Sequence, residues 1–291
     1  MSLLTVRHST VYQYREPVSL GEHYMMFRPR ESHDLRLLES RLIIEPKPVA
    51  LRWLHDVFDN SVAVARFEGM TKKLSFESIV TLEHFENSLP EYKLEEYART
   101  YPFRYSDDDF PNLVNALRRR HLSETISEWA LQFLDPAETT GAMNLLRAMT
   151  QGIRKSFTYS RRVEKGVQTP EKTLETKSGS CRDFAVLMIE GARALGVAAR
   201  FVSGYIYTPN SSGLDGGGAT HAWMQAYLPG AGWIDFDPTN SIVGNRNLIR
   251  VAVAWTPEHA LPLWGTYAGP KGAFLDMDVT VSVTEAALVA A

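Results

Sequence analysis

Residues 179–207 read GSCRDFAVLMIEGARALGVAARFVSGYIY, and this stretch decides the fold. Its apolar residues between Phe184 and Leu195 recur at the three- and four-residue spacing of one helix face. Gly196 follows where a helix C-terminal cap is expected, and the residues after it are rich in strand formers. The stretch therefore predicts a helix over Cys181–Leu195 that leads into a strand.

A second stretch, residues 220–240, reads THAWMQAYLPGAGWIDFDPTN and has the texture of two strands. The Pro-Gly-Ala-Gly segment at 229–232 is a turn signal, so we expect the strands to pair as a hairpin. Upstream, helical periodicity covers Phe110–Leu122, Glu124–Leu134 and Thr140–Phe157. Helices followed by an antiparallel sheet make this second part of the chain α+β.

The first part of the chain has a different texture, with alternating segments rich in β-branched and aromatic residues and separated by turn signals. Four segments of this kind occur, at residues 4–14, 35–46, 61–68 and 74–85. Several short strands in succession predict an antiparallel β-sandwich-like domain. We place that N-terminal β domain at residues 1–88 and the core at residues 89–291.

The core is expected to end in a C-terminal β extension. Residues 251–255 (VAVAW) and 276–283 (DMDVTVSV) are its strand candidates, and we expect them at a sheet edge or between the domains.

Bulk composition narrows the function classes. The chain has 291 residues, of which 44% are hydrophobic and 22% charged, with a net charge of −3. This charge balance gives no reason to expect a nucleic-acid partner. The single cysteine allows no internal disulfide and suits a reducing compartment. No apolar run approaches the roughly 20 residues of a membrane span, and the polar N-terminal residues lack a signal-peptide core. We therefore expect a cytoplasmic protein without a membrane partner.

Cys181 is the residue best suited to covalent chemistry. A lone cysteine is more often a small buried residue than a nucleophile, but the surroundings of this one favour the nucleophile. It follows the tight loop 178–180 (Ser-Gly-Ser), it opens the predicted helix, and Ser180 and Asp183 have the spacing of a capping box. The helix dipole, the unpaired backbone N–H groups and the neighbouring Arg182 all favour the reactive thiolate.

His221 is the candidate base, because it stands at the start of the first hairpin strand, behind the glycine-rich loop 208–219. Taken alone, such a histidine would more often be structural. Two carboxylates of the second strand, Asp235 and Asp237, can orient the imidazole, since the hairpin brings the strands together. Both aspartates point the same way from a regular strand, so the period of two leaves this choice open.

These segments resemble the transglutaminase-like superfamily, whose core carries a Cys–His–Asp triad in this chain order. The matching stretches are residues 168–181 (QTPEKTLETKSGSC), 179–207 and 220–240. In that pattern the cysteine of G-x-C heads a helix, the histidine of H-A-W follows on a strand, and the aspartate precedes Pro-Thr. The resemblance therefore implies Cys181, His221 and Asp237 as the catalytic residues.

The same resemblance leaves Asp235 as a surface or supporting carboxylate. The resemblance is closest to bacterial transglutaminase-like proteins classed as cysteine proteases. These proteins carry an N-terminal β domain before a papain-like transglutaminase core. No acidic cluster of this chain resembles the calcium sites of animal transglutaminases, and its N-terminal histidines are scattered without metal-ligand spacing. We expect no cofactor and no metal.

The function implied is a cysteine-nucleophile acyl transfer on peptide or amide carbonyls through a thioester, in a cysteine peptidase or amidase. One alternative is a transglutaminase that transfers γ-glutamyl groups to amines. Another is a non-catalytic peptide-binding module. Hydrolysis is favoured because transfer needs a site that holds an amine and excludes water, and no segment predicts one. The expected partner is a peptide or protein amide substrate.

Overall fold

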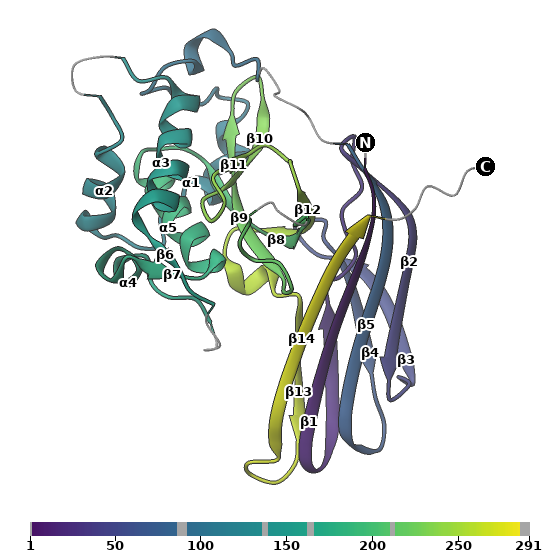
Figure 1. The fold of residues 1–291 in the computed structure, drawn as a ribbon. Helices are drawn as coiled ribbons and strands as arrows, with labels where there is room; N and C mark the ends of the chain where they lie inside the picture. Colours follow the sequence, from purple (N-terminus) through teal and green to yellow (C-terminus); the bar gives the residue numbers. More distant parts are fainter. Residues whose placement is uncertain (1, 86–91, 136–138, 162–165, 210–212, 286–291) are drawn as a thin grey trace.

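The computed structural model describes residues 2–85, 92–135, 139–161, 166–209 and 213–285. Long strands form a curled sheet on one side of the molecule, and helices cover a second, smaller sheet on the other (Figure 1). The predicted domain boundary near residue 88 lies outside the described residues.

The curled sheet contains seven strands. They are β1 (Ser2–Met25), β2 (Leu35–Glu45), β3 (Ala50–His55), β4 (Ser61–Arg66), β5 (Met70–His84), β13 (Leu263–Ala268) and β14 (Phe274–Glu285). The long strand β1 organises the sheet, because its first half pairs with β5 and β14 and its second half with β13 and β4. The curled sheet has an apolar core of its own, which includes Val18, Met25, Leu74 and Phe76.

We expected a sandwich of strands here. The strand-rich antiparallel domain is confirmed and its sandwich arrangement stays a prediction, since within the described residues the seven strands are hydrogen-bonded into one curled sheet. The reason is the length of β1, which bends through a register shift between Gln13 and Val18 and so serves both halves. The C-terminal strand β14, predicted as an edge or interdomain strand, pairs antiparallel with β1 (Figure 1).

The smaller sheet has five strands in the order β11-β10-β9-β8-β12. Their bounds are Ile242–Val243, Gly232–Asp237, His221–Leu228, Ala199–Ile206 and Leu248–Ala254. The predicted hairpin is confirmed as β9 and β10, with Gly232 opposite Leu228 and Phe236 opposite Met224. This register places the start of β9 beside the end of β10.

In the described residues, the same half contains the helices α1 (Phe110–Leu117), α2 (Glu124–Leu131), α3 (Ala142–Ser156), α4 (Pro170–Thr176) and α5 (Cys181–Ala194). Single turns of 3₁₀ helix lie at Glu96–Ala98 and Pro257–Ala260, and the short strands β6 (Thr158–Tyr159) and β7 (Ser178–Gly179) pair with each other. Periodicity predicted α1, α2, α3 and α5. It missed α4, because seven residues give less than two full helical turns of pattern.

Helix α5 is central, since it packs against β8 and β9 on one side and against α2, α3 and α4 on the other. Almost every one of its residues is buried for that reason. Gly191 stands in mid-helix at a cost of about 1 kcal/mol relative to alanine. A Cβ atom there would lie 2.6 Å from the ring of Trp129 and 2.9 Å from Met149, so the close packing of α5 requires the glycine.

Candidate active site

Cys181 is the first residue of α5, and a capping box fixes the backbone around it. The Asp183 Oδ2 atom accepts hydrogen bonds from the Ser180 N–H and the Ser180 hydroxyl, both at 2.8 Å. The other oxygen, Oδ1, accepts the Gln168 N–H at 2.7 Å, so one buried carboxylate ties the helix start to the segment before α4. Sequence spacing predicted this box. The thiol is therefore held at the positive end of a well-anchored helix.

The approach to Cys181 is equally constrained. Strand β7 pairs in parallel with β6, which places Tyr159 opposite Gly179, two residues before the thiol. A Cβ atom on Gly179 would lie 2.9 Å from the Asp183 Cβ, so the loop needs glycine to come this close to the helix. Burial raises the pKa of Tyr159 to about 12, and the nearby Cys181 adds to the rise. Tyr159 is therefore held close in the fold to the segment that leads into Cys181.

The imidazole of His221 lies at the start of β9 and meets Asp237 at the end of β10. Its Nε2 atom is 2.9 Å from the Asp237 Oδ2 atom, and both side chains are fully shielded from solvent. Cys181 interacts with the same ring. Since Asp237 occupies Nε2, the nitrogen left for the thiol is Nδ1, which is buried and has no normal hydrogen bond within the described residues. The structure thus brings the three predicted residues together in the order thiol, imidazole, carboxylate.

The electrostatics of this pair favour charge on both partners. Burial alone would lower the pKa of His221, but the Asp237 carboxylate outweighs burial and raises it, and Cys181 raises it further. Burial would likewise raise the pKa of Asp237, but His221 and further donors lower it. Those donors are the Thr239 N–H at 2.9 Å from Oδ1 and the Asn240 amide at 2.8 Å from Oδ2. The arrangement stabilises an imidazolium beside the thiol.

Asp235 lies elsewhere on the same strand face. Its Oδ1 atom accepts the Trp223 indole N–H at 2.6 Å and the Gln225 amide at 2.8 Å. The carboxylate is buried, so of the two expected alternatives, a surface or a supporting carboxylate, the surface one is wrong. The indole it holds stacks on the imidazole of His221, with ring centroids 5.9 Å apart and planes inclined by 27°. Asp235 therefore holds Trp223, which stacks on His221, and does not contact the imidazole pair directly.

Gly216, in the described part of the glycine-rich loop, lies against the imidazole. Gly216 has a φ of +94°, and a Cβ atom there would lie 2.4 Å from the His221 Nδ1 atom. In the same region, Cys181 is only 6% exposed and His221 only 1%. The sequence indicated a glycine-rich loop before His221, but it gave no signal that Gly216 itself contacts the ring.

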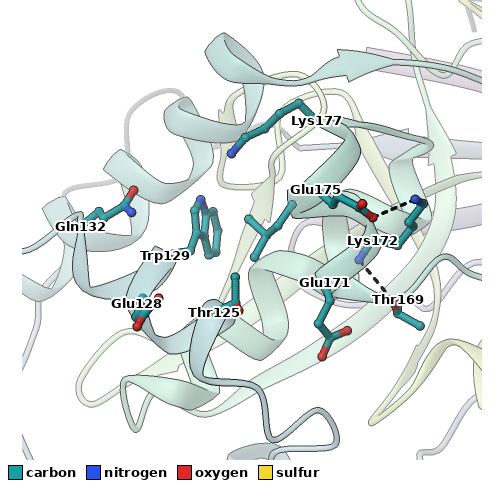
Figure 2. Close-up of a pocket in the computed structure, with 10 residues that line it drawn as sticks. Thr125, Glu128, Trp129, Gln132, Thr169, Glu171, Lys172, Glu175 and Lys177 are labelled. Carbon is teal, nitrogen blue, oxygen red and sulfur yellow. Dashed lines mark hydrogen bonds and ion pairs between the residues drawn. The ribbon is translucent and has the colours of Figure 1, made fainter.

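The candidate site does not line the surface cavity between α2 and α4. That cavity, of about 620 Å³, lies between α2 and α4 with Trp129 and Leu174 on its walls. Figure 2 shows the charged residues around it, among which Lys172 and Glu175 form an ion pair. Within the residues described, no group of three or more His, Cys, Asp or Glu side chains is placed to hold a metal ion. Of the helices described, none is long and apolar enough to cross a membrane.

Comparison with known families and proteins matches two regions of the chain. Residues 129–238 match the transglutaminase-like superfamily core, and residues 4–83 match the bacterial transglutaminase-like N-terminal region. An uncharacterized protein of Mycobacterium tuberculosis is 27% identical over 302 residues, covering 95% of this chain and 91% of the relative. An uncharacterized protein of Mycobacterium leprae is 38% identical over 111 residues, which is 38% of each chain.

The fold has a solved counterpart over the whole chain. The crystal structure of a Cytophaga hutchinsonii protein, described as a "putative cysteine protease", has a TM-score of 0.70 and 20% identity, and the match covers 99% of this chain and 93% of that one. This likeness supports the fold rather than an activity. The two matched regions show that the chain carries a transglutaminase-like core at residues 129–238 and an N-terminal region of the bacterial transglutaminase-like type at residues 4–83.

Proposed function

We propose that this protein is a cysteine-nucleophile acyl-transfer enzyme that hydrolyses peptide or amide bonds. The observation that carries the proposal is the buried His221–Asp237 pair, 2.9 Å apart, beside a thiol at a helix N-terminus. The transglutaminase-like core supports cysteine-based catalysis in general. The roles of the three residues in this chain are our inference from their geometry.

In the proposed mechanism, the Cys181 sulfur attacks the carbonyl carbon of the substrate and a C–S bond forms. The His221 imidazolium then gives its proton to the leaving nitrogen, the C–N bond breaks, and a thioester remains. His221 next takes a proton from water, whose oxygen attacks the thioester carbon. The C–S bond then breaks, the carboxylic acid leaves, and the Cys181 thiolate and the His221 imidazolium are regenerated. Asp237 holds the imidazole orientation and stabilises its cation throughout.

The tetrahedral intermediate carries an oxyanion that needs donors. The Cys181 backbone N–H is the first, because it is an unpaired group of the first helical turn. We infer that the Tyr159 hydroxyl is the second, because the pairing of β6 with β7 sets Tyr159 opposite Gly179, two residues before the thiol. Tyr159→Phe should then lower kcat about 10²-fold without slowing iodoacetamide labelling of Cys181. An unchanged kcat would remove Tyr159 from the mechanism.

The decisive experiment incubates the protein with amide-containing peptides, with and without excess primary amine, and identifies the products by mass spectrometry. Cleaved or deamidated peptides that persist in the presence of amine support the hydrolase. Amine adducts as the main product would replace it with the transglutaminase alternative. The absence of any product that Cys181→Ala abolishes would replace it with a peptide-binding module.

The lone thiol also bears on location. A nucleophile that must stay reduced suits a reducing compartment, so we propose a cytoplasmic enzyme. Fractionation of the source cells against compartment markers tests this proposal, and recovery with the envelope fraction would contradict it.

A further inference from the structure

Asn240 lies beside the candidate triad and forms hydrogen bonds with both Asp237 and Asp215. Its Nδ2 atom donates to the Asp237 Oδ2 atom at 2.8 Å, the same oxygen that meets His221. The same nitrogen donates to the Asp215 carbonyl at 3.1 Å, and Oδ1 accepts the Asp215 N–H at 2.7 Å. Both amide hydrogens and the carbonyl oxygen are thus in use.

These bonds join two parts of the site. Asp215 directly precedes Gly216, whose backbone packs against the Nδ1 side of His221. Asn240 therefore fixes the carboxylate on one side of the imidazole and the loop on the other. We propose that Asn240 is a positioning residue that holds the loop Gly213–Gly218 closed over His221 while it orients Asp237. This inference rests on the proposed function for its catalytic meaning, but not for the geometry it predicts.

Only an amide suits this position. An aspartate would set a second carboxylate against Asp237, and like charges in contact inside a protein repel strongly. An alanine would leave the Asp215 N–H and one site on the Asp237 carboxylate without a partner. Besides Asp237, the titratable group that acts on the His221 ring is Cys181 from α5. Tyr159 of β6 in turn is influenced by Cys181, Asp215, Arg161 and Asp237.

A second contact also ties the loop down, and its strength can be compared. Asp215 forms an ion pair with Arg154, but the two side chains are 37% and 40% exposed. Exposed ion pairs contribute little to stability because solvent screens them. The two bonds between Asn240 and the Asp215 backbone lie in a less exposed place and do not depend on charge. We therefore expect Asn240, rather than Arg154, to decide whether the loop stays closed.

Amide hydrogen exchange of the full-length protein tests this expectation without substrate. Asn240→Ala should speed exchange at Asp215–Gly218 about tenfold or more, since the loss of one to two hydrogen bonds changes the opening equilibrium by that factor. Asp215→Asn is the matched control, because it removes the ion pair and keeps both backbone bonds. Its exchange should stay within about twofold of the unmodified protein.

A second readout reports on the triad side. The proton shared by His221 Nε2 and Asp237 should give a sharp low-field NMR signal, identified by its loss in His221→Asn. Asn240→Ala should broaden or abolish that signal, while Asp215→Asn should leave it. Circular dichroism establishes that each variant is folded, and Asn240→Asp serves as a second variant expected to show the same changes more strongly.

The outcomes separate this inference from the proposed function. Unchanged exchange and an unchanged low-field signal in Asn240→Ala would overturn the positioning role, whatever the activity. Equal effects of Asn240→Ala and Asp215→Asn would overturn it as well, because the ion pair would then be the closing contact. If the Asn240 effects appear but Cys181 supports no turnover, the positioning role stands and the proposed function fails.

Discussion

Asp235 and Asp237 lie two residues apart on β10, and both contact side chains of β9. They differ in whether their surroundings favour the charged or the neutral form of the carboxyl group. Asp237 meets an imidazole, whereas Asp235 meets an indole N–H and a side-chain amide. Burial raises the pKa of both groups. At Asp237 the partners overcome burial and the pKa falls; at Asp235 they do not, and the pKa rises.

The difference teaches what holds a charge inside this protein. Neutral donors such as Trp223 and Gln225 stabilise a carboxylate, but they do not replace the water that burial removes. Arg250 lies 3.7 Å from the Asp235 Oδ2 atom and only partly compensates. His221 can take a full charge in direct contact with Asp237. The same strand therefore carries one carboxylate fit for a catalytic pair and one fit for support.

Exchange of each carboxylate for its amide breaks the comparison most strongly. Asp237→Asn should reduce acyl transfer about 10⁴-fold, the loss seen when a triad carboxylate of a serine protease is neutralised. The reason is that the imidazole loses both its orienting acceptor and its counter-charge. Asp235→Asn should cost less than about tenfold, because an amide oxygen can still accept the Trp223 N–H.

Both rates are measured on the peptide that the product screen identifies, with iodoacetamide labelling of Cys181 as a measure that needs no substrate. Thermal denaturation establishes that the two variants are folded to the same extent. A larger loss in Asp235→Asn than in Asp237→Asn would invert the assignment of the two aspartates.

The sequence alone identified Asp235 and Asp237 as candidates, but it did not show which of them contacts His221. Hydrophobic periodicity predicted α5, and the turn at 229–232 predicted the hairpin that joins β9 to β10. A strand period of two gives Asp235 and Asp237 the same direction, so only the resemblance to a family pattern separated them. The structure adds the register, which puts His221 next to one carboxylate and Trp223 next to the other.

Other features lay beyond sequence reasoning for identifiable physical causes. Asn240 and Gly216 act through close tertiary contacts, and neither contact follows from a local pattern. The curled N-terminal sheet depends on β14 pairing with β1 from the far end of the chain. Long-range pairing of this kind is set by global packing, which strand texture does not encode.

Substitution of two glycines, Gly216 and Gly218, tests the side of the His221 imidazole that faces away from Asp237. Gly216 and Gly218 have φ values of +94° and +79°, so alanine strains the backbone at both positions. Only at Gly216 does the added Cβ meet the His221 ring, at 2.4 Å; at Gly218 nothing lies within 4 Å. Gly216→Ala should lower acyl transfer about 10²-fold by displacing the ring or the loop. Gly218→Ala should stay within a few-fold, and equal losses would mean that strain, not contact, matters here.

Stability should distinguish the supporting carboxylate from its own amide. Asp235→Ala leaves the buried donors of Trp223 and Gln225 without an acceptor, which costs about 1–3 kcal/mol for each unsatisfied group. Asp235→Asn keeps an acceptor and should cost about 1 kcal/mol. Urea denaturation followed by tryptophan fluorescence measures the two free energies of unfolding. Equal values would show that the Asp235 hydrogen bonds contribute little.

The finest distinction between the two carboxylates is the pH at which His221 loses its proton. In the native protein Asp237 raises the pKa of His221, so the imidazolium should persist above the ordinary histidine value of about 6.5. The alkaline limb of kcat/KM should therefore lie above that pH, because the leaving nitrogen needs this proton.

In Asp237→Asn the counter-charge is gone while burial remains, and burial lowers the pKa. The His221 titration, followed by NMR because activity is low, should then move below the ordinary value. In Asp235→Asn it should stay where it is, since Asp235 contacts the indole and not the imidazole. A downward move in Asp235→Asn of the same size as in Asp237→Asn would show that both carboxylates set the charge of His221, and the division of roles along β10 would be lost.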